Sequence, residues 1–95
     1  MKILVCCGSG LGSSFMIEMN IKNILKEIGV EAEVSHCDLS SASGNKSDIY
    51  VGTRDIASQL EGLGGIVVSL NNMVDKKEMK EKMEAAVKEF QGNAD

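Results

Sequence analysis

A cysteine followed by glycines and serines stands directly after the first apolar run and could hold a phosphoryl group. Cys7 comes first, and it precedes Gly8, Ser9, Gly10, Leu11, Gly12, Ser13 and Ser14. Glycines let backbone N–H groups approach a ligand closely, and serine hydroxyls add hydrogen-bond donors. A helix that begins here points its free N–H groups and positive dipole end at the same place. We therefore expect Cys7 to be catalytic and the residues from Gly8 to Ser14 to bind phosphate.

The same N–H groups and dipole are expected to lower the pKa of the Cys7 thiol, which makes a thiolate near neutral pH. A thiolate beside a phosphate site predicts a covalent cysteinyl phosphate. The segment is not a Walker loop, because no lysine follows Gly12, and its glycine spacing is not the dinucleotide fingerprint. The alternative interpretation of Cys7 is a buried structural cysteine.

A cysteine-dependent phosphatase or an arsenate reductase-like enzyme is an alternative function. The loop resembles that of cysteine phosphatases. In those enzymes a cysteine follows a strand, five residues come next, and a serine or threonine stands one place after the position that Ser13 occupies here. Those enzymes carry an arginine where this chain has Ser13, and they use an aspartic acid, usually beside a proline, as general acid. This chain contains no proline. Without that arginine a phosphocysteine should hydrolyse slowly, as a carrier requires.

The hydrophobic pattern alternates between strand and helix character, which is typical of an α/β fold with a parallel sheet. Strands are predicted at 3–6, 31–36, 48–51 and 66–70, and helices at 13–28, at 53–60 and from Asp75 onward. Residues 38–47 are rich in serine, glycine and asparagine and are predicted to be a loop. Asp75 is predicted to cap the last helix.

These elements predict one three-layer Rossmann-like domain over residues 1–91, followed by a frayed tail at 92–95. Its four-stranded parallel sheet should have the order 2-1-3-4 and carry three helices. The switch point of that order lies between the first and third strands, and open α/β sheets bind ligands there at the carboxyl ends of the strands. The loop after Cys7 lies at this point.

Thr53 and Arg54 follow the third predicted strand and are accessory candidates beside the phosphate loop. Thr53 could cap the short helix. Arg54 is a cation at a helix start, where it opposes the dipole, so an anion should compensate it. That anion could be the Asp55 carboxylate, the phosphate or the acidic surface of a partner.

Three other residues invite a functional interpretation. His36 and Cys37 stand together, but their spacing and number do not make a metal site, and no metal or cofactor is expected. His36 could be a second phosphocarrier or an acid, and Cys37 a redox relay to Cys7; the alternative for both is a half-exposed place at the sheet edge. Cys6 should point to the opposite side of the strand from Cys7 and pack in the core.

Four methionines at helical spacing are expected to fill the core rather than form a partner groove. They are Met16, Met19, Met79 and Met83. Phe15 and Met16 lie close to the phosphate loop, so exposed docking residues are the alternative for these two.

The 95 residues carry a formal net charge of −4, which argues against binding nucleic acid. No apolar run reaches the roughly 20 residues that span a bilayer. We expect a cytoplasmic protein with free thiols.

The stretch from Cys7 to Ser14, at the start of a small four-strand domain, resembles the IIB component of the bacterial phosphoenolpyruvate-dependent sugar phosphotransferase system. The Cys-Gly-x-Gly-x-Gly-Ser-Ser form is most similar to the ascorbate and galactitol branch, with the ascorbate type favoured. The resemblance implies that Cys7 accepts a phosphoryl group from a phosphohistidine of a IIA partner. Cys7 would then pass it to an ascorbate- or galactitol-like sugar bound by a membrane IIC partner. It also implies peripheral association with the inner face of the membrane through IIC. The oligomeric state stays open, with a monomer preferred. A non-catalytic sensor is the third hypothesis.

Overall fold

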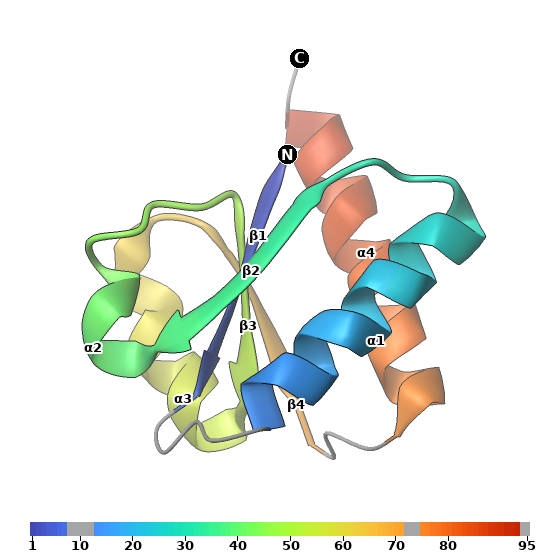
Figure 1. The fold of residues 1–95 in the computed structure, drawn as a ribbon. Helices are drawn as coiled ribbons and strands as arrows, with labels where there is room; N and C mark the ends of the chain where they lie inside the picture. Colours follow the sequence, from blue (N-terminus) through green and yellow to red (C-terminus); the bar gives the residue numbers. More distant parts are fainter. Residues whose placement is uncertain (8–12, 72–74, 94–95) are drawn as a thin grey trace.

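The computed structural model describes residues 1–7, 13–71 and 75–93, in which strands and helices alternate along the chain (Figure 1). The strands are β1 (Lys2–Cys7), β2 (Glu33–Asp38), β3 (Ile49–Thr53) and β4 (Ile66–Leu70). The helices are α1 (Ser13–Ile28), α2 (Leu39–Ala42), α3 (Arg54–Leu60) and α4 (Lys76–Asn93), with a short 3-10 helix η1 (Glu61–Leu63) after α3.

The sheet has the predicted order β2-β1-β3-β4, and all three pairs of neighbouring strands are parallel. Strand β1 lies inside the sheet and is apolar over Ile3 to Cys6, as expected for a strand buried on both faces. The switch point therefore lies between β1 and β3, and β1 ends there at Cys7.

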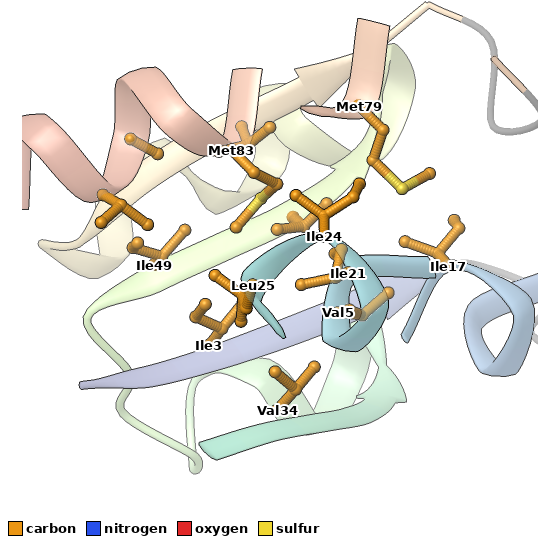
Figure 2. Close-up of a cluster of buried hydrophobic side chains, with 14 of the residues drawn as sticks. Ile3, Val5, Ile17, Ile21, Ile24, Leu25, Val34, Ile49, Met79 and Met83 are labelled. Carbon is orange, nitrogen blue, oxygen red and sulfur yellow. The ribbon is translucent and has the colours of Figure 1, made fainter. Parts of the chain in front are cut away.

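Helices cover both faces of the sheet and make three layers (Figure 1). Helices α1 and α4 pack together on one face, and α2 and α3 lie on the other. Alternate residues of β1 supply both cores: Ile3 and Val5 face α1 and α4, whereas Leu4 and Cys6 face α2 and α3. Figure 2 shows the larger core, on the α1 and α4 side.

The methionines divide between core and surface. Met79 and Met83 are completely buried in the larger core, as predicted. The same prediction was wrong for Met16 and Met19, whose exposed fractions are 57% and 48%. The alternative given for Phe15 and Met16, that both are exposed, agrees with the structure. The reason is rotational: Ile17, Ile21 and Leu25 fill the inward stripe of α1, so the first two methionines fall on its outer side.

The bounds of β1, β3 and α3 differ from the predicted ranges by one or two residues, and the larger differences lie in β2 and in the segment that follows it. Strand β2 begins and ends two residues later than the predicted 31–36, because it pairs with β1 from Lys2↔Glu33 to Cys7↔Asp38. The predicted loop at 38–47 contains the single turn α2, so the sheet carries more than the three predicted helices. Burial of Ala42 against the core beneath α2 accounts for this turn.

Helix α4 begins as its sequence predicts. The Asp75 carboxylate accepts hydrogen bonds of 3.1 Å from the backbone N–H groups of Lys77 and Glu78. The helix continues to Asn93 and so includes the first two residues of the predicted tail, while residues 94–95 lie outside the described part.

Candidate functional site

The four strands end in one line at the carboxyl edge of the sheet. Cys7 pairs with Asp38, the last residue of β2, and Thr53 pairs with Leu70, the last residue of β4. Cys7 and Thr53 each stand two residues beyond the Val5–Val51 pair, so they end β1 and β3 at the same level. The register therefore brings Cys7 and the accessory residue Thr53 to adjacent strand ends.

The predicted phosphate loop joins this edge to α1. Its first residue, Cys7, ends β1, and its last two, Ser13 and Ser14, open α1. The structure describes these three residues by their backbone. The five between them, Gly8 to Gly12, lie outside the described residues. The first turn of α1 holds no acidic residue, so no carboxylate of the helix competes there with an anion.

The other accessory residue, Arg54, lines a cavity of about 510 Å³ at the ends of β3 and β4. Its lining residues are Thr53, Arg54, Asp55, Ser58, Leu70 and Asn71. Arg54 is exposed, and it is the chain's only arginine. Among the described residues it makes no ion pair, with Asp55 or with any other carboxylate. Thr53 occupies the N-cap position of α3, as predicted, but its side chain makes no capping hydrogen bond.

Asn71 is a lining residue that the sequence reasoning missed. Its backbone N–H and its side-chain amide donate to the two carboxylate oxygens of Glu78, at 3.0 and 2.8 Å. These bonds tie the end of β4 to the first turn of α4 and fix the wall of the cavity. One indication of this residue was present in the sequence, because Asn71 follows the fourth strand directly.

A second cluster of polar side chains lies between α1 and β2. Glu18 is buried, with 7% exposed, and its carboxylate accepts a hydrogen bond from His36 Nδ1 and pairs with Lys22 Nζ at 2.9 Å. Burial opposes ionisation of Glu18, but the hydrogen bonds and charges of His36 and Lys22 outweigh it, so the pKa of this carboxyl is lowered. The rings of His36 and Phe15 are in turn nearly perpendicular, with centroids 6.2 Å apart.

The remaining chemical candidates take structural places. Cys6 is buried, as predicted, and its register partner Cys37 is half-buried. His36 lies at the edge strand and is bound to Glu18. Over the described ranges, no cluster of three or more His, Cys, Asp or Glu residues could hold a metal ion.

The comparisons with known families and proteins agree on one type of protein. The family model described as "PTS system, Lactose/Cellobiose specific IIB subunit" matches residues 2–85. The chain is 27% identical over 82 residues to the ascorbate-specific PTS system EIIB component of Mycoplasma pneumoniae, covering 83% of this chain and 86% of that protein. The corresponding Salmonella typhimurium protein is 28% identical over 91 residues, covering 93% and 90%.

A solved structure shares the fold. The lactose-specific IIB component domain from Streptococcus pneumoniae superposes with a TM-score of 0.63 at 15% identity, covering 93% of this chain and 95% of that one. Within the described part of the chain, no helix is both long and apolar enough to cross a membrane.

Proposed function

Because the chain belongs to the IIB family of the sugar phosphotransferase system, we propose that it carries a phosphoryl group on Cys7. The group comes from the phosphohistidine of a IIA partner and goes to a sugar held by a membrane IIC partner. The observation that carries this proposal is the position of Cys7: it ends a central strand, at the switch point, where a glycine- and serine-rich segment leads into α1.

The first transfer needs a thiolate and a charge-stabilising loop. The sulfur of Cys7 attacks phosphorus, and the S–P bond forms as the P–N bond to the donor histidine breaks. The electron pair returns to the imidazole nitrogen, which takes a proton from solvent. Backbone N–H groups and hydroxyls from Gly8 to Ser14 hold the phosphoryl oxygens, and such electrostatic positioning supplies most of the catalysis in phosphoryl transfer.

The second transfer reverses the role of sulfur. A sugar hydroxyl oxygen attacks phosphorus, the O–P bond forms, and Cys7 leaves as the thiolate while the hydroxyl proton passes to solvent. Ser13 stands where cysteine phosphatases carry arginine, so water is poorly assisted as a competing acceptor. Thr53 and Arg54 are accessory residues: both line the cavity at the neighbouring strand ends, and Arg54 has an unpaired charge among the described residues.

The substrate that we propose is an ascorbate- or galactitol-like sugar, with the ascorbate type favoured. The support is the form of the Cys7–Ser14 segment and the description of the relatives as ascorbate-specific. The family model carries a lactose/cellobiose description, so a disaccharide system is the comparison to test. We further propose a cytoplasmic monomer that meets the membrane through IIC.

The test is reconstitution of the relay. The protein is incubated with phosphoenolpyruvate, the general phosphotransferase proteins and an ascorbate-type IIA protein, and intact mass reports the added phosphoryl group. We expect one group, placed on Cys7 by peptide mapping. Cys7→Ser should accept none, whereas the matched control Cys37→Ser should be labelled at the wild-type rate. Transfer that survives in Cys7→Ser contradicts the proposal, and rapid turnover of a phenyl phosphate or arsenate by the isolated protein favours the hydrolase or reductase.

A further inference from the structure

The outer side of α1 and the first turns of α4 form an exposed surface beside the candidate site. We call it the α1–α4 surface and define it by Phe15, Met16, Met19, Lys76, Lys77 and Lys80. Both helices begin at the carboxyl edge of the sheet, where Cys7 ends β1 (Figure 1). A protein that approaches Cys7 from the side of these two helices therefore contacts the α1–α4 surface.

The apolar part of this surface is continuous around the start of α1. Phe15, Met16 and Met19 are the large hydrophobic side chains that are exposed among the described residues, each by about half its area. At 100° per residue they cover the outer side of the helix from the β2 side to the α4 side. Phe15 meets the His36 ring of β2, and Met16 lies on the stripe of Asn20 and Asn23, which face α4. Clustered exposed hydrophobic groups mark interaction sites.

The α4 part of the surface is basic. Lys76, Lys77 and Lys80 line a cavity of about 420 Å³ between the two helices, with Asn20, Asn23 and Glu27 of α1 opposite them. Lys80 pairs with Glu27 at 3.5 Å, whereas Lys76 and Lys77 make no ion pair within the described ranges. The carboxylate of Asp75, which precedes Lys76 in the chain, accepts two backbone hydrogen bonds from α4. This local positive charge stands out on a chain whose net charge is −4.

We propose that the α1–α4 surface is the docking site of the phosphohistidine-bearing donor, through a donor surface that sets carboxylates around an apolar centre. The inference rests on the proposed function, since it assigns a partner to the same site. Opposite charges speed the encounter of two soluble carriers that must meet and separate quickly. The apolar side chains of α1 supply the desolvated centre of a small, transient interface.

Two other occupants, a loop of IIC and anionic lipid, fit the positive charge of the α1–α4 surface less well. Cytoplasmic loops of membrane proteins carry an excess of lysine and arginine, so a IIC loop would be repelled by Lys76 and Lys77. Recognition of anionic lipid uses clusters of about four to eight basic residues, and here a few lysines stand on an acidic chain. Vesicle binding is nevertheless measured as a separate outcome.

The experiment compares two double charge reversals with equal effect on net charge. Lys76→Glu/Lys77→Glu changes the α1–α4 surface, and replacing lysine by glutamate in the first turn of α4 agrees with the helix dipole, so folding is preserved. Lys46→Glu/Lys88→Glu is the matched control, because both lysines are exposed and lie outside this surface. A third variant, Met16→Ser, tests the apolar part without changing charge.

The rate of phosphoryl transfer from the phosphorylated IIA donor is measured against donor concentration at low and high salt. We expect the Lys76/Lys77 variant to lose about tenfold in kcat/KM through KM, and to lose most of its salt dependence. The control variant should match the wild type, and Met16→Ser should raise KM at every salt concentration. Equal kcat/KM for the two charge reversals would overturn the inference.

Binding of the unphosphorylated donor is measured independently by NMR titration of the labelled protein. Shifts should gather on the first half of α1 and the first turns of α4, and shifts confined to α2 and α3 contradict the docking site. If wild-type protein accepts no phosphoryl group, the proposed function fails while this titration still judges the surface. Lysine-dependent binding to vesicles of phosphatidylglycerol and phosphatidylcholine, without donor binding, assigns the surface to the membrane and overturns the inference.

Discussion

Glu18 and His36 are hydrogen-bonded across the boundary between α1 and β2, and this bond holds a buried carboxylate at the flank of the larger core. Lys22 completes the group from the next turn of α1. Because the His36 ring also contacts the Phe15 ring, the pair connects the core to the exposed start of α1. The edge strand β2 is thus held to α1 by polar as well as apolar contacts.

The Glu18 pair predicts a pH-dependent part of the stability. The pKa of Glu18 is lower in the folded protein than its ordinary value of 4.5, so folding favours the carboxylate. This stabilisation is complete above the ordinary value and is lost as the pH falls through the depressed value. Glu18→Gln should therefore be less stable than wild type at pH 7, with a difference that shrinks in acid. Urea unfolding across this pH range measures the difference.

The control for that experiment is Glu27→Gln, which removes an exposed carboxylate from the same helix. Exposed ion pairs contribute little, so its unfolding free energy should stay within about 1 kcal/mol of wild type at each pH. A Glu18→Gln difference that is the same at all pH values would contradict the role given to this carboxylate.

Met83 and Met16 allow the same substitution to be compared at a buried and at an exposed position. Met83 is completely buried among Ile21, Ile24 and the other residues of the larger core, so Met83→Ala should cost about 2–5 kcal/mol of unfolding free energy (Figure 2). Met16 is 57% exposed, and Met16→Ala should change it by less than about 0.5 kcal/mol. Denaturant midpoints compare the two directly, and similar losses would show that α1 is rotated from the orientation described.

We expect the close packing around Gly52 to affect the candidate site. A Cβ at this position would lie 2.9 Å from Ile56 Cγ2 and 3.3 Å from the carbonyl oxygen of Cys6. The branched Ile56 side chain cannot move away freely, so Gly52→Ala should cost about 1–3 kcal/mol and displace α3 or the end of β1. Phosphoryl transfer should fall at temperatures where circular dichroism shows the variant folded. Gly62→Ala is the control, because nothing lies within 4 Å of its added Cβ.

We expect the charge of Arg54, at the strand ends, to affect the rate of phosphoryl transfer. If it contacts the phosphoryl group or the donor, Arg54→Gln loses a charge-assisted hydrogen bond of about 1.5–3 kcal/mol, which corresponds to a tenfold or greater fall in transfer rate. Asp55→Asn removes the opposite charge from the same cavity and should leave the rate unchanged or raise it. Single-turnover transfer from the donor measures both, and wild-type rates in Arg54→Gln would remove this residue from the site.

Much of the fold was predictable because it depends on local patterns. The stripe of Ile17, Ile21 and Leu25 and the stop at Gly29 predicted α1 with its observed bounds. Alternating strands and helices led to the order β2-β1-β3-β4, since parallel crossovers are right-handed and short. The role of Cys7 and the residues from Gly8 to Ser14 remains a prediction from composition and spacing.

What the sequence determined by itself is the topology that brings Cys7 to a strand end, whereas the chemistry of this residue stays a prediction. Only the tertiary structure decided what surrounds it. The register aligned Asp38, Cys7, Thr53 and Leu70, and cross-strand pairing shifted β2 by two residues. The packing of α1 decided that Met16 is exposed and Glu18 buried. The register and the shift of β2 depend on contacts between residues far apart in the chain, which local periodicity does not encode.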